Sequence, residues 1–130
     1  MIQKIAVPTR QHSQMVDITD EVQRAVGESQ VEEGIALVFC PHTTAGLTIN
    51  ENADPSVCAD ILETLEKVVP WRGAYRHTEG NAAAHVKSTL VGHSVTVLVE
   101  GGRLILGTWQ GIFLCEFDGP RTRRVFVRVR

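Results

Sequence analysis

The sequence predicts an α+β fold with a mixed but mainly antiparallel, strongly curved sheet. Two observations predict it. Apolar runs of strand length occur on both sides of helix-period stretches near residues 19–28, 54–69 and 81–90, and the last third of the chain contains strand patterns alone. A chain of 130 residues is long enough to bury one core but not to divide in two, so we expect one domain over residues 1–130.

The first part of the chain alternates short strands with one helix. We expect strands at 2–7 and 15–18, a helix capped by Thr19-Asp20 and ending near Glu28, and further strands at 35–40 and 47–49. The helix that follows is the clearest element, because Asp54 suits the N-cap, Pro55 suits the first helical position and Pro70 ends the pattern.

The helix expected at 81–90 has a side that carries a histidine. Steps of 100° per residue place Ala82, Ala83, Val86 and Leu90 on the core side and His85 on the opposite side. We therefore expect His85 to face solvent, a folded-over loop or another subunit.

The remaining residues predict three strands in a meander. Residues 94–100 and 103–117 flank the two-residue turn Gly101-Gly102, and 123–130 closes the chain. Residues 103–117 are apolar on both faces, and the glycines within 107–111 indicate a bulge or a close backbone approach.

The composition is that of an ordinary globular protein. A net charge of −2 gives no reason to expect nucleic acid or an anionic membrane as a partner, and no apolar run approaches the ~20 residues that span a bilayer. No leader pattern begins the chain, and three scattered cysteines without a CxxC indicate reduced, buried thiols. We expect a cytoplasmic protein.

The stretch Pro41–Pro55 (PHTTAGLTINENADP) is the first candidate site. It places His42 and several polar side chains between a strand end and a helix start, where functional residues are common. Glu51 and Asp54 suit a general base or partners that orient a ligating imidazole, although capping alone explains Asp54. An ordinary strand-to-helix connection is the alternative.

Other candidates lie outside this stretch. His77 and His85 are eight residues apart and are candidate metal ligands with His42, although isolated surface histidines remain the alternative. Glu116 and Asp118 lie at the end of an apolar strand. A catalytic role is one interpretation of these carboxylates, and a salt bridge from Arg121 to either of them is the alternative. Trp109-Gln110 suits either packing or a pocket wall. The Arg/Phe face of residues 123–130 favours a subunit contact.

Four motifs carry a resemblance to a known family: HTTAGLTINENAD, YRH, GNAAAHVKSTLVG and GRLILGTWQGIFLCEFDGPRTRRV. They resemble the small YjbQ-like, or UPF0047, proteins from about residue 5 to the C-terminus. The resemblance implies a sheet bent into a partial barrel with two to three helices packed on it, and a homotrimer. It also implies a secondary thiamine-phosphate synthase activity, which joins hydroxymethylpyrimidine diphosphate to thiazole phosphate and releases diphosphate.

The resemblance also implies roles for individual residues. It implies a divalent metal, zinc by preference, at His42, His77 and His85, and a phosphorylated small molecule as substrate. The implied catalytic residues are Asn50, Glu51, Asn52, Asp54 and Glu116, and the implied substrate-binding residues are Thr43, Thr44, Lys87, Trp109, Gln110 and Arg121. Three hypotheses stay open: a metal-dependent transferase or hydrolase, a non-catalytic trimer that binds an anionic metabolite, and a scaffold whose polar motif builds the trimer.

Overall fold

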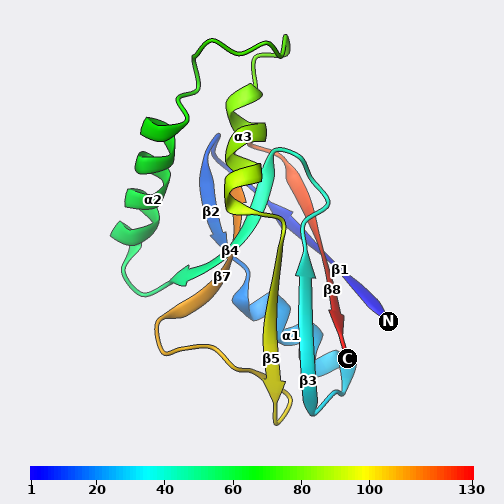
Figure 1. Cartoon of the computed structure of the whole chain (residues 1–130). Coiled ribbons are helices and arrows are strands. Elements are labelled where there is room, and N and C mark those ends of the chain that lie inside the picture. Colours follow the sequence, from blue (N-terminus) through cyan, green and yellow to red (C-terminus); the bar gives the residue numbers. More distant parts are fainter.

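A computed structural model describes residues 1–130 of the chain as an arrangement of strands with three helices (Figure 1). In order the elements are β1 (Ile2–Pro8), β2 (Gln14–Asp17), α1 (Thr19–Ser29), β3 (Glu33–Phe39), β4 (Ala45–Glu51), α2 (Pro55–Val68), α3 (Ala82–Val91), β5 (Ser94–Glu100), β6 (Arg103–Leu104), β7 (Gln110–Glu116) and β8 (Thr122–Val129). None of the helices has both the length and the apolar character that a membrane crossing requires.

The strands form two antiparallel sheets, one of them curled into a half-barrel, which confirms the α+β prediction. The larger sheet has the order β1-β8-β3-β5-β6, and the smaller has the order β2-β7-β4. The expected three-strand meander is wrong in two respects. Strand β8 pairs with β1 and β3 and not with β7. Residues 103–117 do not form one strand, because β6 pairs with β5 in the larger sheet whereas β7 lies in the smaller one.

The main core lies between the two sheets and α1. Its 17 buried residues include Val22 and Val26 of α1, Leu114 of β7, and Val125 and Val127 of β8. A second, smaller cluster lies on the opposite face of β7, where Cys115 and Phe117 pack near α2 and α3. Both faces of β7 are therefore covered, which explains why the residues between Gln110 and Glu116 at its two ends are all apolar or glycine.

The expected core side of α3 is partly wrong. Val86 and Leu90 are exposed (41% and 58%), whereas Ala82, Ala83, Ala84, Lys87 and Ser88 are buried. The alanines let the helix lie close to β4, and Ser88 Oγ donates to the carbonyl of Ala45 at 2.7 Å. Lys87 and Ser88 can be buried because each has a hydrogen-bond partner. A prediction from hydrophobicity alone therefore placed Val86 and Leu90, and not these two residues, on the buried side.

Two helix starts differ from each other. Asp54 caps α2 as predicted, and its carboxylate accepts from the Ser56 amide at 2.9 Å. The predicted cap of α1 is wrong: Thr19 is its first helical residue, and its hydroxyl donates to Asp17 instead. The expected turn at Gly101-Gly102 is confirmed, and both glycines have positive φ (60° and 72°), a conformation that glycine adopts without a steric penalty.

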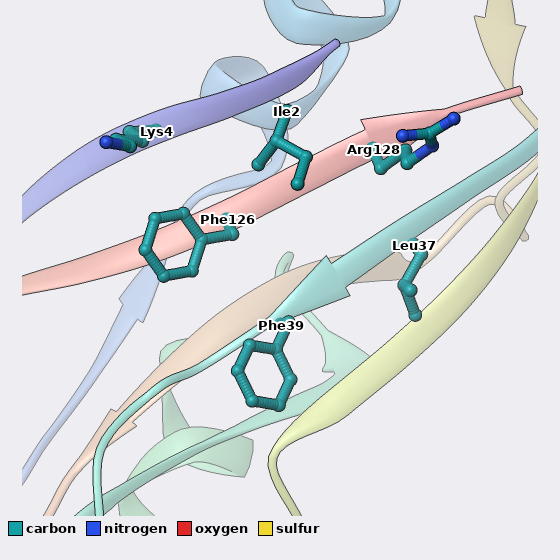
Figure 2. Close-up of a pocket in the computed structure, with 6 residues that line it drawn as sticks. All are labelled: Ile2, Lys4, Leu37, Phe39, Phe126 and Arg128. Carbon is teal, nitrogen blue, oxygen red and sulfur yellow. The ribbon is translucent and has the colours of Figure 1, made fainter.

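The outer face of the larger sheet is apolar and uncovered. Ile2, Leu37, Phe39 and Phe126 form the floor of an open groove of about 390 Å³ on β1, β3 and β8, with Lys4 and Arg128 beside them (Figure 2). The position of Phe126 and Arg128 agrees with the predicted outward face of the last strand.

Candidate functional site

The candidate residues gather at two opposite ends of the β4–β7 pair. Ala45 pairs with Glu116 at one end, and Glu51 pairs with Gln110 at the other. We call the first the histidine end (residues 9–12, 41–45, 69–85 and 116–124) and the second the asparagine end (residues 50–54 and 109–111). At about 3.3 Å per residue, a seven-residue strand separates them by roughly 20 Å. A single chain therefore does not bring His42 together with Asn50–Asp54, although the sequence predicts one pocket for both.

His42 continues the ladder of hydrogen bonds between β3 and β8. Ile35 and Arg130 exchange backbone bonds, and the same register assigns the amide of Arg124 to residue 41. Because β3 ends at Phe39, the ladder does not continue to residue 41, and the Arg124 amide donates to His42 Nε2 instead, at 2.9 Å. Nε2 is thus an acceptor and the proton lies on Nδ1. Burial and the neighbouring Arg123 cation lower the pKa of His42.

Glu116 lies in a buried ion pair with Arg123. Its carboxylate accepts from Arg123 Nε at 2.8 Å and from the Arg123 Nη2 group, from the Thr9 hydroxyl at 2.8 Å and from the Asp118 amide at 3.0 Å. Burial by itself raises the pKa of Glu116, but these donors outweigh burial and leave the pKa lowered. All of its oxygens are used, so Glu116 fits a structural role better than the catalytic role that the sequence predicts.

The two threonines of the motif have different surroundings. Thr44 is buried, and both its carbonyl and its hydroxyl accept from Arg123, at 3.1 and 2.8 Å. Thr43 is exposed. Of the pair, only Thr43 faces solvent, where a substrate could reach it.

His77 and His85 lie together, so of the three alternatives for His85 (solvent, a folded-over loop or another subunit) the structure shows the folded-over loop. Their ring centroids are 5.1 Å apart and the rings meet edge to face. His77 belongs to the loop between α2 and α3, and Figure 1 shows this loop at the same end of the molecule as the start of β4.

A pocket of about 320 Å³ adjoins this histidine pair. Its lining residues are Trp71, Arg72, Gly73, Tyr75, His77 and Gly80 of the loop and Ala82 of α3. The volume is at the lower end of the range for small-molecule sites, roughly 300–1,000 Å³. One guanidinium, one imidazole and two aromatic rings suit an anionic ligand with a flat ring.

The basic residues that the sequence assigns to substrate binding have other partners. Lys87 is 3% exposed, and its Nζ donates to Glu66 of α2 at 2.6 Å. Arg121 pairs with Asp118 at 3.2 Å and closes the turn, so Asp118 is the partner among the two carboxylates that the sequence offers. The basic group that lines the pocket is Arg72.

Polar side chains at the asparagine end mostly bond to their own backbone. Asn50 accepts from the Glu51 amide at 2.8 Å, and Glu51 accepts from the Asp54 amide at 3.1 Å. Asn52 Nδ2 donates to Asp17 at 3.2 Å. Only Asn52 therefore joins segments distant in sequence, and the other groups shape the connection into α2.

Trp109 and Gln110 complete the asparagine end. Trp109 is 62% exposed, and Gln110 Oε1 accepts from the Gly107 amide at 2.8 Å. A Cβ at Gly111 would lie 2.6–2.9 Å from the side chain of Asn52, so the predicted close approach at this glycine is confirmed. Trp109 does not pack into the core and is free to contact a partner or a ligand.

Three residues at the histidine end had no functional assignment from the sequence: His12, Asn81 and Arg123. The His12 ring meets Trp71 edge to face at 4.3 Å and lies 4.0 Å from Asp118. Asn81 donates to Asp118 at 2.9 Å, and its own Oδ1 is buried without a partner. His12 is distant from these residues in sequence, so no local pattern could identify it. A fully buried Glu116 requires a cation, which is the signal that could have identified Arg123.

Within one chain, the structure brings together two of the three predicted metal ligands, His77 and His85. No group of three or more histidine, cysteine, aspartate or glutamate side chains is arranged to hold a metal ion. Zinc needs three or four donors, and His77 and His85 provide two. His42 does not fit as the third, because its Nε2 is bonded to Arg124 and its Nδ1 carries a proton. A complete metal site cannot be assembled from this chain alone.

The family model described as "UPF0047 protein YjbQ-like" matches residues 3–130 of this chain. The chain belongs to this family. It is 53% identical to UPF0047 protein YugU of Bacillus subtilis, over 99% of this chain and 98% of that protein. It is 50% identical to UPF0047 protein MJ1081 of Methanocaldococcus jannaschii, over 99% and 94%.

Solved structures of relatives have the same fold. An uncharacterised YjbQ/UPF0047 protein of Clostridium acetobutylicum is 55% identical, with a TM-score of 0.97 over 98% of this chain and 99% of that one. A protein of unknown function from Sulfolobus solfataricus is 36% identical, with a TM-score of 0.95 over 99% and 95%. Because relatives of unknown function share this fold, its function has to be argued from the site itself.

Proposed function

We propose that the chain is a small-molecule transferase that binds phosphorylated substrates in the loop pocket at the histidine end. The observation that carries the proposal is the pocket itself, in which Arg72 and His77 line a cavity beside His85. The proposed reaction is the thiamine-phosphate synthase activity implied by the family resemblance. The ring nitrogen of thiazole phosphate attacks the methylene carbon of the pyrimidine, and diphosphate leaves with the electron pair of the broken C–O bond.

The side chains of the pocket suit this chemistry. The Arg72 guanidinium offers paired donors to phosphate oxygens, and the aromatic rings of Trp71 and Tyr75 offer surfaces to the pyrimidine. The Arg72 guanidinium would also stabilise the negative charge that develops on the leaving diphosphate. Arg72 supplies a basic group to this pocket, whereas the Pro41–Pro55 stretch contains no lysine or arginine.

We also propose zinc as the metal, with His77 and His85 as two of its ligands, since imidazole nitrogens suit zinc. The remaining donors must come from outside one chain. We assign no step of the reaction to the metal.

The proposed assembly is a homotrimer. The uncovered face of the larger sheet supports it, because Ile2, Leu37, Phe39 and Phe126 expose a contiguous apolar surface that isolated proteins rarely leave in water (Figure 2). A subunit contact at this face agrees with the interpretation of the Arg/Phe strand from the sequence.

A non-catalytic binding protein for a phosphorylated metabolite is the second candidate. One observation favours it: the carboxylates of Glu51, Asp54 and Glu116 all accept local hydrogen bonds, so none of them is free as a general base. This candidate predicts thermal stabilisation by the ligand without turnover.

The deciding experiment incubates the purified chain with both thiamine precursors and measures thiamine phosphate and diphosphate. We expect product from the wild type, at least a hundredfold slower formation in His85→Gln, and a KM about tenfold higher in Arg72→Ala. His93→Gln, at an exposed histidine, is the matched control and should keep full activity. Ligand-induced stabilisation without product in the wild type would select the binding protein instead.

A further inference from the structure

The pocket lies between two separate parts of the chain. All of its lining residues except Ala82 belong to the loop that follows α2, whereas Ala82 begins α3. The shape of the pocket and the contact between His77 and His85 therefore depend on how the loop is held against α3.

Glu66 connects these two parts. Its Oε1 accepts from Lys87 Nζ of α3 at 2.6 Å, and its Oε2 accepts from the backbone amide of Trp71, the first lining residue of the loop, at 2.7 Å. No other side-chain hydrogen bond joins residues 55–80 to α3. One carboxylate thus fixes the start of the pocket wall to the opposite side, an arrangement that we call the Glu66 bridge.

The other attachments of this region are apolar: Val69 is buried, and Leu62, Leu65 and Trp71 pack against the second cluster. Helix α2 has no buried residue, and its Val68 is 67% exposed. Within the loop, the Tyr75 hydroxyl donates to the Pro70 carbonyl, and the His12 ring contacts Trp71. Because Lys87 is almost fully buried and Glu66 is its only partner, the ion pair is shielded from solvent on the lysine side.

We propose that Lys87 and Glu66 are positioning residues that hold His77 against His85 and thereby set the shape of the pocket. This assigns to Lys87 a role different from the substrate contact that the sequence predicts. Lys87 acts on the pocket through Glu66 and Trp71, without touching a ligand. The inference rests on the proposed use of this pocket, but its test requires no turnover.

The test compares Lys87→Met with Lys67→Met by NMR of the imidazole rings and by the rate of Cys58 labelling with a thiol reagent. Lys67 lies on α2 and forms an exposed pair with Glu63 of the same helix at 3.3 Å, so Lys67→Met is a matched control for the loss of a lysine charge. Cys58 is partly buried on α2, whereas Cys40 and Cys115 are buried, and burial raises the pKa of the Cys115 thiol to about 12. Labelling of Cys58 therefore reports how tightly α2 is held.

We expect Lys87→Met to shift the ring signals of both His77 and His85 and to speed Cys58 labelling at least tenfold, with no change in Lys67→Met. Glu66→Gln keeps the shape of the side chain but removes its charge, and it should show the same changes if Lys87→Met does not fold. The exchanged pair Glu66→Lys/Lys87→Glu should not restore the signals, because a lysine at position 66 cannot accept from the Trp71 amide. Unchanged histidine signals in the folded Lys87→Met or Glu66→Gln variant would overturn it, whether or not the wild type makes thiamine phosphate.

Discussion

The two ends of the β4–β7 pair use similar polar residues in different ways. At the histidine end, Glu116 and Arg123 are buried and satisfy each other across the turn between β7 and β8. At the asparagine end, Asn50 and Glu51 bond to the backbone of their own connection. Charged side chains at the histidine end therefore join segments that are distant in the sequence, whereas polar side chains at the asparagine end stabilise one local connection. Removing a side chain should therefore cost more at the histidine end.

The largest expected effect is at Arg123. Arg123→Met leaves Glu116 as an uncompensated buried charge, and breaking a buried pair in this way typically costs about 3–5 kcal/mol. Urea unfolding should show this loss. The double variant Glu116→Leu/Arg123→Met removes both charges and should recover most of the stability. If the free energy of unfolding of Arg123→Met falls by less than about 1 kcal/mol, the buried pair does not hold the histidine end together.

A smaller, pH-dependent effect is expected at His42. His42→Ala removes the acceptor of the Arg124 amide, and a lost hydrogen bond of this kind costs about 1 kcal/mol. The pKa of His42 is lower in the folded chain than the usual value, so the unfolded chain binds more protons. Its stabilising contribution is thus complete above the unfolded pKa of about 6.5 and is lost as the pH falls through the lower, folded pKa.

The measurement for His42 is the free energy of unfolding between pH 5 and pH 8, a range of about 1.5 units on each side of the unfolded pKa. The difference between the wild type and His42→Ala should shrink toward acid pH. His93→Ala, at an exposed histidine, is the control and should parallel the wild type. A constant difference across the range would show that the hydrogen bond from the Arg124 amide does not depend on a neutral imidazole.

The smallest expected effect on stability is at Glu51. Glu51→Gln keeps an oxygen that accepts from the Asp54 amide, so the free energy of unfolding should change by less than about 0.5 kcal/mol. This makes the variant a clean probe of chemistry. If the variant keeps its stability but no longer forms thiamine phosphate, the asparagine end belongs to the active site. Since one chain holds the two ends apart, a second subunit would then have to bring them together. Undiminished product would remove Glu51 from the mechanism.

Metal content tests the remaining ligand prediction. We expect about one zinc per subunit in the purified chain, retained by His42→Ala and lost from His77→Ala/His85→Ala, because only the latter pair has its rings together. Elemental analysis of dialysed protein is the measurement. Loss of zinc from His42→Ala would place that histidine in the metal site, and no zinc in the wild type would favour a role for the pair in the pocket alone.

The sequence by itself determined most of the elements, because their signals are local. The Asp54-Pro55 start of α2, the Gly101-Gly102 turn and the alternation of Val125 and Val127 each depend on neighbouring residues, and each is confirmed. The buried side of α3 depended on partners distant in sequence. Lys87 and Ser88 are buried because Glu66 and the Ala45 carbonyl receive their hydrogen bonds, which no periodicity of α3 contains.

The candidate site depended even more on the tertiary structure. A continuous motif suggested one pocket, but an extended strand carries its first and last residues far apart, so the motif is divided between two ends. Only folding brings His77 to His85 and Arg123 to Glu116, because loop geometry and burial decide these contacts. The sequence determined which chemical groups are present, and the packing of the strands and the loop decided which of them meet.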